Sequence, residues 1–497
     1  MLLLQPAKGF TMTTATTSSS GAEPEQRVNF GGNQRWYARV LRPTSEAELL
    51  QILVRHGGST VKALGSGHSW SSIGADTDIA IDMSAFACVK AVTEDASIVR
   101  VGAGCRLQDL LDRLHAMSDR TLPTLGAITK QTISGAIATG THGSGRPSLS
   151  HFVVRLRAAV FDPDTGAPVI KEFAEGPELL AARCGLGCLG IVVSVDLPTV
   201  PKYLVAETTR KCSSLADAQA LFAKNPLTNF LWSPYTWTVL AFERRVAEER
   251  TQSPGQRLKA LFFRLFNFVM LDVVFHLLVI AVRKFGRAGI KLLFTIVPHT
   301  MPTNRTRVDE STQVLTFHHD FFRHEEMELF VAERHFGRAM EFLQAAVEAF
   351  SQAASPALPT LRAQVSEAGL SDDVDGLAGS YVHHYPLFFR RVLPEETMVS
   401  MGASIDEPVY SISIFTYYPP GRRASYYAFC SLVARVLVKQ VGARPHWGKH
   451  FPLEHADIAP LYPRLEEFRT LCRRYDRAGM FRNGYTFRVL GLGRQDG

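Results

Sequence analysis

Apolar and polar positions alternate along the first 200 residues in a way that predicts alternating strands and helices. Apolar residues recur at helical spacing directly after Ser45-x-x-Glu48, the pattern of a capping box, and again over 107–114. Short runs rich in β-branched residues lie at 61–64, 79–81, 99–101 and 191–195. We therefore expect an α+β domain rich in glycine turns over residues 29–200.

The pattern changes beyond residue 200. Aromatic residues predict strand structure within 230–237, and 258–297 is a very apolar stretch. A helix with one apolar face is predicted through Phe336, Met340, Leu343, Val347 and Phe350. We expect a second α+β domain over 201–429 that faces the substrate, and a C-terminal segment over 430–497.

Composition narrows the class of protein. Of 497 residues, 46% are hydrophobic and 20% charged, so the chain can bury a large core. The net charge of +7 is not gathered into a block of like charges, which favours an anionic cofactor or an acidic lipid surface over nucleic acid. Seven cysteines without a CxxC pair argue against a disulfide framework and a structural zinc.

The N-terminal residues predict no folded element. Met1–Leu4 is apolar but too short for the core of a signal peptide, and 11–26 is rich in Thr and Ser. We expect residues 1–28 to form a disordered tail.

Two glycine-rich segments are candidate ligand-binding loops. The first, directly after the predicted strand at 61–64, is Ala63, Leu64, Gly65, Ser66, Gly67, His68 and Ser69. Its glycines allow a sharp turn and close approach of backbone N–H groups to a phosphate. The second segment, 132–145, is long, dense in small residues and nearly free of charge, as a flat rigid ligand would require.

A third segment, 185–190, matches GxGxxG but lacks the context of a nicotinamide-dinucleotide site. That site needs a strand before the glycines, a helix after them and an acidic residue about twenty positions on. Here a predicted helix at 179–183 precedes them and the strand at 191–195 follows. The order of elements therefore disfavours a nicotinamide dehydrogenase.

Late in the chain, His446-Trp447-Gly448-Lys449 places a histidine and a lysine on one turn. A lysine ammonium beside a ring system that gains electrons would stabilise the developing negative charge. The alternative is that both are ordinary exposed polar residues.

Together, the loop with His68, the ISGAIATGTHGSG segment, LGCLGIV and HWGK resemble the vanillyl-alcohol-oxidase superfamily of flavoproteins, and within it the aldonolactone oxidase branch. The resemblance implies a two-subdomain FAD-binding domain of the p-cresol methylhydroxylase type and an α+β substrate (cap) domain. It also implies oxidation of a CH–OH donor by hydride transfer to FAD. The final acceptor would be O2, giving H2O2, or a respiratory electron acceptor.

The resemblance also implies roles for individual residues. His68 would carry a covalent bond to FAD, and Gly126 would control access of O2. Lys449 and Arg390 would stabilise the reduced flavin, and His446 would either assist the proton transfer or orient Lys449. The remaining FAD contacts would come from the loop at 63–69 and from Ala127, Thr132, Ser134, Gly135, Thr139, Gly140, Thr141, His142, Gly190 and Ile191.

The substrate domain departs from the family pattern at Phe388. The family places Glu-x-Arg on one strand, and here Arg390 matches the arginine while Phe388 replaces the glutamate. A phenylalanine cannot hold a sugar hydroxyl, so a more apolar alcohol becomes plausible beside a lactone or polyol. One of Glu325, Glu326 and Glu328 could face the cavity, although a solvated strand edge fits them equally well.

A metal site is not expected. His318, His319, Asp320 and His324 lie near Glu325, but Glu328 occupies the position where an HExxH motif needs its second histidine.

The apolar stretch at 258–297 admits two interpretations. Asn267, Asp272 and His276 interrupt it, which disfavours a spanning helix, and basic residues flank both ends. It is therefore either a helix lying in a membrane interface or a buried helix of the cap domain, so the protein is cytoplasmic or a peripheral membrane protein. The alternative functions are oxidation of a lipid or sterol-like alcohol at a membrane, and flavin binding without turnover.

Overall fold

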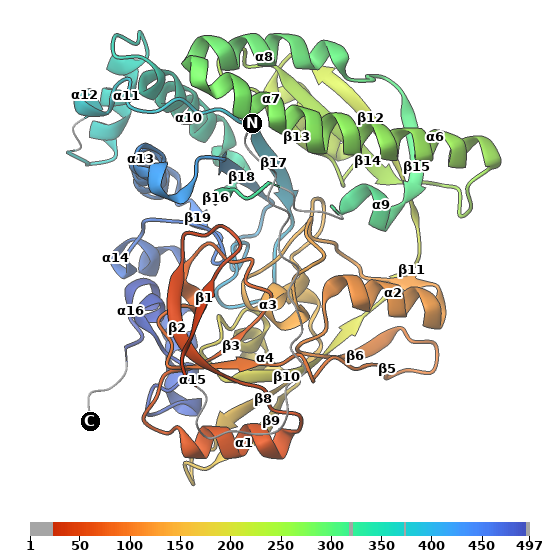
Figure 1. The fold of residues 1–497 in the computed structure, drawn as a ribbon, viewed down its shortest axis with the longest axis vertical. Helices are drawn as coiled ribbons and strands as arrows, with labels where there is room; N and C mark the ends of the chain where they lie inside the picture. Colours follow the sequence, from red (N-terminus) through yellow and green to blue (C-terminus); the bar gives the residue numbers. More distant parts are fainter. Residues whose placement is uncertain (1–22, 318–321, 372–373, 494–497) are drawn as a thin grey trace.

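A computed structural model describes residues 23–317, 322–371 and 374–493. The chain forms two halves that meet along a central seam, with the N-terminal half at the bottom of Figure 1 and the large sheet of the second half above it.

The first half is built on two sheets. The four-stranded sheet has the order β1-β2-β4-β3 and consists of β1 (Glu25–Val28), β2 (Arg35–Leu41), β3 (Val61–Leu64) and β4 (Ile79–Asp82). The five-stranded sheet has the order β5-β6-β10-β8-β9 and consists of β5 (Val89–Ala91), β6 (Ile98–Gly102), β8 (Arg155–Phe161), β9 (Pro168–Phe173) and β10 (Ile191–Pro198). The short strands β7 (Arg120–Thr121) and β11 (Val200–Pro201) pair with each other.

Four helices connect these strands, namely α1 (Glu46–Arg55), α2 (Leu107–Ser118), α3 (Ile133–Ala138) and α4 (Gly176–Arg183). The Ser45 side chain accepts a hydrogen bond from the backbone N–H of Glu48 and so caps α1, as predicted. In a capping box the Glu48 carboxylate would accept from the backbone N–H of Ser45. Here it accepts from the N–H of Thr44 at 2.7 Å instead.

The expected tail at 1–28 is too long at its C-terminal end. Glu25–Val28 form β1, because β2 offers these residues backbone partners in an antiparallel ladder that pairs Gln26 with Tyr37. Residues 1–22 lie outside the described part of the chain.

The second half is organised around an eight-stranded sheet in the order β15-β12-β14-β13-β17-β18-β16-β19. Its strands are β12 (Leu204–Cys212), β13 (Asn229–Trp232), β14 (Val239–Val246), β15 (Thr306–Glu310), β16 (Glu325–Ala332), β17 (Leu387–Val392), β18 (Val409–Thr416) and β19 (Arg444–Pro445). The strand predicted within 230–237 ends early, because Tyr235 and Trp237 have φ of 67° and 53° and turn the chain into β14.

Helices complete this half. They are α5 (Leu215–Ala220), α9 (Ser311–Leu315), α10 (Phe336–Ser351), α11 (Leu358–Glu367), α12 (Val374–Leu377) and α13 (Ala424–Val441). The predicted amphipathic helix is α10, whose apolar face is buried as expected. The last helices, α14 (His455–Ile458), α15 (Leu465–Tyr475) and α16 (Gly484–Leu490), follow β19, and α15 contacts α4 of the first half.

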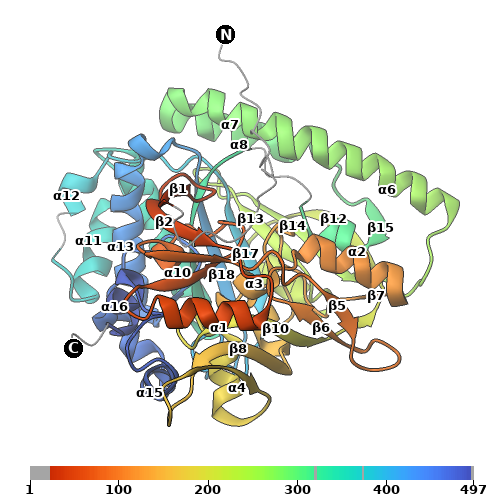
Figure 2. The ribbon, with the colours of Figure 1, turned by 60° about the horizontal axis from the view of Figure 1, so that its bottom comes forward.

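The apolar stretch forms a helical hairpin, hereafter the hairpin, over Pro254–Thr300. Its first arm joins α6 (Pro254–Phe266), a π-helical segment (Asn267–Phe275) and α7 (His276–Val282), and its second arm is α8 (Gly286–Thr300). The chain reverses through a short turn that ends at Gly286, where φ is 60°. Figure 1 shows the two arms lying side by side, and Figure 2 shows the hairpin along one edge of the molecule.

The hairpin is not a buried element. Only 11% of its most apolar stretch is buried, although it is long and apolar enough to cross a membrane by length and composition. Large apolar side chains face solvent, and we call this set the outer face: Leu258, Leu261, Phe262, Leu265, Leu277, Leu278, Leu292 and Ile296. The interpretation as a buried helix is therefore wrong.

Candidate functional site

One large cavity, of about 1610 Å³, runs through the seam between the two halves. The glycine loop at Gly65 borders it on one side, and Arg390 and Lys449 border it on the other. The inner side of the hairpin, including Phe275, also borders it. The cavity therefore joins every segment in which the sequence predicts a ligand site.

The glycine loop after β3 lies directly against the start of α3. A Cβ atom on Gly65 would lie 2.7 Å from the hydroxyl oxygen of Thr132, so only glycine permits this approach. The Thr132 side chain also caps α3 by accepting from the N–H of Gly135. Bare backbone from both segments therefore faces the cavity, as a flat dinucleotide such as FAD requires.

The cavity walls include most of the predicted FAD contacts. These are Ala63, Leu64, Gly65, Ser66, Gly67, His68, Ser69, Ala127, Thr132, Ser134, Gly135, Thr139, Thr141, His142, Gly190 and Ile191. Two predicted residues lie behind the wall. Gly126 is buried against the Thr141 methyl group, and Gly140, with φ of 77°, lies against Met401.

The GxGxxG segment lies between α4 and β10, in the helix-then-strand order that the sequence predicts. Gly187 and Gly190 border the cavity. A Cβ atom on Gly190 would lie 2.4 Å from the carbonyl oxygen of Ala159 on the neighbouring strand β8. The glycines thus serve close backbone packing beside the ligand cavity and not the turn of a nicotinamide site.

Strand β16 brings three glutamates into the interior, and all three are almost completely buried. Side chains alternate along a strand, so Glu326 and Glu328 share the face that borders the cavity, whereas Glu325 points to the opposite face. The solvated-edge alternative for these residues is wrong.

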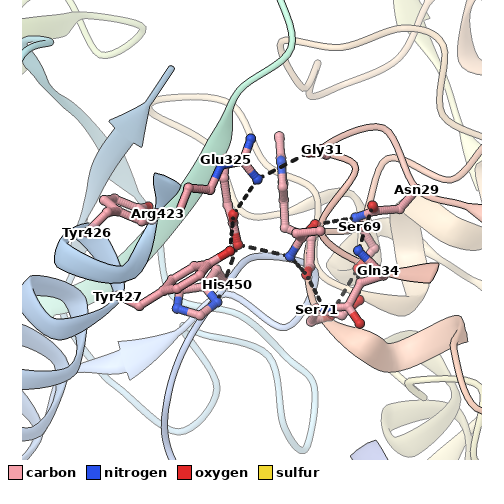
Figure 3. Close-up of polar contacts among 12 residues, drawn as sticks. Asn29, Gly31, Gln34, Ser69, Ser71, Glu325, Arg423, Tyr426, Tyr427 and His450 are labelled. Atoms are coloured by element: carbon pink, nitrogen blue, oxygen red, sulfur yellow. Dashed lines mark hydrogen bonds and ion pairs between the residues drawn. The ribbon is translucent and has the colours of Figure 1, made fainter. Parts of the chain in front are cut away.

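Glu325 holds the two halves together on the side away from the cavity (Figure 3). Its carboxylate accepts from Asn33 at 2.9 Å, from Arg423 at 2.6 Å and from the Tyr427 hydroxyl at 2.8 Å. Arg423 also donates to the carbonyl of Gly31 at 3.1 Å. This network fixes the start of β16 and thereby the placement of the two glutamates beyond it.

Glu328 forms a buried triad with Arg390 and His142. One of its carboxylate oxygens accepts from Arg390 at 2.6 Å and lies 3.2 Å from His142 Nε2. Burial by itself raises the pKa of Glu328, but Arg390, His142 and Lys449 together lower it by more and hold that pKa well below its usual range. The second carboxylate oxygen and Arg390 Nε have no hydrogen-bond partner among the described residues. The cavity wall therefore offers a donor and an acceptor to a bound group.

Lys449 is the second positive charge on this wall. Its ammonium group contacts the Glu326 carboxylate and lies 4.4 Å from the centre of a Trp70 ring. Burial raises the pKa of Glu326, and the nearby Lys449 opposes that shift. The sequence did not indicate that Glu326 and Trp70 position Lys449.

His446 reaches the site because β19 pairs with β16. The N–H of His446 donates to the Glu328 carbonyl at 2.9 Å, which places the HWGK turn beside both glutamates. His446 Nδ1 accepts from the N–H of Gly448 at 3.0 Å, and burial lowers the pKa of the ring well below its usual value. A neutral ring with Nδ1 in use as an acceptor carries its proton on Nε2.

His142, Glu328 and His446 come close enough to resemble a metal site, with potential ligand atoms within 4.8 Å of one another. The Glu328 oxygen that faces His142 already accepts from the Arg390 guanidinium. A cation there would be repelled by Arg390, so the geometry fits a hydrogen-bonded triad better. His318, His319 and Asp320, from which no metal site is expected, lie outside the described residues.

Phe388 borders the cavity beside Arg390, whose guanidinium lies 5.4 Å from the centre of its ring. Glu328 reaches Arg390 from β16, across the intervening strand β18. A carboxylate thus accompanies Arg390, but from a different strand than the Glu-x-Arg pattern implies. The available sequence signal was the set of three glutamates in a strand whose other residues are apolar, two of them, Glu326 and Glu328, at alternate positions.

Comparison with known proteins agrees with this geometry. The family model described as D-arabinono-1,4-lactone oxidase matches residues 195–489, and an FAD-binding domain model matches 37–164. A long-chain alcohol oxidase from an uncultured marine euryarchaeote is 37% identical over 479 residues, covering 94% of this chain and 98% of its own. An L-gulonolactone oxidase of Bos taurus is 26% identical, covering 90% of this chain and 94% of its own.

Solved structures show the same fold. A cholesterol oxidase from B. sterolicum superposes with a TM-score of 0.70 at 14% identity, covering 94% of this chain and 97% of its own. The fold is therefore the expected vanillyl-alcohol-oxidase (p-cresol methylhydroxylase) type of FAD-binding fold. The chain belongs to the D-arabinono-1,4-lactone oxidase family and is an FAD-linked oxidoreductase that acts on CH–OH donors.

Proposed function

We propose that the protein oxidises long-chain aliphatic alcohols to aldehydes, with FAD as hydride acceptor and O2 as the final oxidant. The observation that carries this proposal is the cavity wall beyond Arg390. There, Phe388, Phe415, Phe275 and Phe294 border the space where a sugar lactone would need polar partners. The 37% identity to a long-chain alcohol oxidase over nearly the whole chain supports the same substrate class.

The protein's own side chains have distinct roles in this proposal. FAD, when bound, supplies the acceptor for the hydride that leaves the alcohol carbon. Lys449 and Arg390 place fixed positive charge on the cavity wall, and Glu326 and Glu328 hold them there. His446 Nε2–H donates to the alcohol oxygen and orients it, while Glu326, whose pKa burial raises, accepts the hydroxyl proton.

The substrate class is tested by measuring H2O2 release and anaerobic flavin bleaching with alcohols of increasing chain length, polyols and aldonolactones. We expect kcat/KM to rise with chain length and the lactones to be poor substrates. The matched variant is Phe388→Glu, which restores the glutamate of the family pattern and should shift preference toward hydroxyl-rich donors. A wild-type preference for lactones would contradict the proposal.

We also propose that His68 carries a covalent bond to FAD. His68 follows β3, borders the cavity and stacks on Phe30 with 5.2 Å between ring centres. Acid-precipitated wild-type protein should stay yellow, while His68→Ala should release its flavin into the supernatant. A colourless wild-type pellet would contradict the covalent bond but not the FAD site.

Contact with a membrane surface is the third part of the proposal. The outer face of the hairpin gathers exposed apolar side chains, and the same helices and their turn carry the exposed basic residues Arg257, Lys259, Lys284 and Lys291. The inner side of the hairpin packs on the protein body, so the hairpin would lie flat in the interface and not cross the bilayer. We expect binding to anionic vesicles and release at high salt, and equal recovery in the supernatant with and without vesicles would contradict it.

A further inference from the structure

The two sides of the hairpin have different surroundings. Its outer face is exposed, whereas the opposite side of the same helices lines the cavity that contains Arg390 and Lys449. Residues from both arms contribute to that lining, including Leu271 and Phe275 from the first and Phe294 and Val297 from the second. One element thus connects the exposed apolar surface with the interior of the active site.

The first arm contributes an exposed side chain, Phe268, to the cavity wall. This side chain borders the cavity and is 40% exposed. One turn further along, Leu271 is half-buried, and Phe275 beyond it is only 8% exposed. All three border the cavity. Burial therefore increases along an apolar row, Phe268, Leu271 and Phe275, beside which the polar residues Asn267, Asp272 and His276 also border the cavity.

Polar contacts anchor the hairpin on either side of this row. Before it, Arg264 pairs with the fully buried Asp309, with 2.7 Å between Nε and Oδ2. After it, His276 Nε2 accepts from the Tyr417 hydroxyl at 2.9 Å, and His276 Nδ1 donates to the Leu271 carbonyl at 2.9 Å. The helix between these anchors is wound as a π-helix, a rare geometry that recurs at functional sites.

We propose that Asn267–Phe275 forms a portal through which the alcohol enters the active site directly from an anionic lipid bilayer. This inference rests on the proposed function, since it names the route of the same substrate. Each methylene group moved from lipid into water lowers the equilibrium constant about fourfold. A route from bilayer to apolar cavity avoids that cost for every carbon of the chain, and the row from Phe268 to Phe275 provides it.

The test compares two exposed apolar residues one turn apart. Phe268 borders the portal, whereas Leu265, 61% exposed on the outer face, does not border the cavity. Phe268→Asp and Leu265→Asp each place one carboxylate on the membrane-facing surface, so vesicle binding should weaken equally. Steady-state oxidation is then measured with a long-chain alcohol in vesicles and with a short water-soluble alcohol.

We expect Phe268→Asp to raise KM for the long-chain alcohol about tenfold over Leu265→Asp, because only Phe268→Asp puts a charge in the path of the chain. The saturating rate and the short-alcohol kinetics should agree within about twofold between the variants, since no catalytic group changes. Phe268→Trp against Leu265→Trp gives the same comparison without a charge and covers any failure of the aspartate variants to fold.

Equal KM values in the two variants would overturn the portal and leave the proposed function standing. A wild-type protein whose flavin no long-chain alcohol reduces would overturn both. The wild-type measurement, made first, distinguishes these two outcomes.

Discussion

Strand β16 and the hairpin reverse the usual relation between polarity and burial. β16 carries three glutamates within its first four residues and is buried along its whole length. The hairpin contains the one helical stretch of the described residues that is long and apolar enough to cross a membrane, yet only 11% of its most apolar part is buried. Burying unpaired carboxylates and exposing a large apolar surface both cost free energy. Each segment therefore needs other groups that offset its cost.

The partners differ in kind. The glutamates have theirs within the chain: Arg423, Arg390 and Lys449 face Glu325, Glu328 and Glu326 respectively. The outer face of the hairpin has no comparable partner among the described residues, and burying one exposed leucine would be worth about 1.5–3 kcal/mol. The buried glutamates therefore belong to a site whose partners all lie within the chain. The exposed apolar surface instead indicates a site whose partner comes from outside the chain.

The largest expected effect is on stability, and it comes from removing the negative charge of Glu328. Glu328→Gln leaves Arg390 buried without its counter-charge, so we expect the free energy of unfolding to fall by about 3–5 kcal/mol in denaturant titrations. The matched control is Glu333→Gln. Glu333 pairs with Arg391, the next residue of β17, but with side chains 34% and 22% exposed, and should lose at most about 1 kcal/mol. Equal losses would show that the Glu328 pair is not energetically distinct.

The second-largest expected effect is on the rate of flavin reduction. Lys449→Ala removes one of the two positive charges that border the cavity beside Glu326, and we expect flavin reduction to slow by about 10²–10³-fold in anaerobic stopped-flow measurements. Lys439→Ala, at an exposed position near the end of α13, is the control and should reduce its flavin at the wild-type rate. Unchanged kinetics in Lys449→Ala would remove this residue from the mechanism.

The first half of the molecule was largely predictable because its signals are local. The strand at 61–64 and the cap at Ser45 each specify a structure through neighbouring residues alone. The small residues of 132–145 indicated a ligand site, but not the short helix α3 that part of this segment forms. The glycine contacts are an exception. The need for glycine at Gly126 and Gly140 comes from Thr141 and Met401, so the sequence alone cannot distinguish packing glycines from glycines that touch a ligand.

The second half was less predictable because its site depends on sheet order. Arg390 and Glu328 are 62 residues apart and meet only because β17, β18 and β16 are neighbours. His446 joins them through β19, a strand of two residues that no periodicity signals. Hydropathy identified the apolar stretch, but it predicted one helix and not the two arms that the chain forms. Exposure depends on which side of these arms the rest of the protein covers.

The third prediction tests the exposed region. Leu261→Asp lies on the outer face at 62% exposure, and we expect the affinity for anionic vesicles to fall about tenfold or more, because a charge replaces a side chain that would be buried in the interface. Val54→Asp, at 65% exposure on α1 of the first half, is the matched control. Sedimentation with vesicles measures both, and equal losses would contradict a specific membrane-binding face.

The effect that is smallest at neutral pH is the contribution to stability of two buried histidines without a counter-charge. His383 and His384 are fully buried, and burial lowers the pKa of each to about 3, so the folded protein keeps them neutral. The unfolded chain takes up these protons below its ordinary histidine pKa near 6.5. Stability attributable to each histidine is therefore present above about pH 6.5 and is lost progressively as the pH falls toward 3, by about 1.4 kcal/mol per pH unit per residue.

His384→Gln isolates this contribution. The histidine accepts from the backbone N–H of Tyr417 at 3.0 Å, and the glutamine amide oxygen can accept the same bond without titrating. Between pH 6 and 4, the slope of unfolding free energy against pH should therefore decrease by about 1.4 kcal/mol per pH unit relative to wild type. His299→Gln, at an exposed position on α8, should leave the slope unchanged. An unaltered slope in His384→Gln would mean that this histidine is protonated in the folded protein, and that the interior beside β18 tolerates a charge without a carboxylate partner, unlike the interior beside β16.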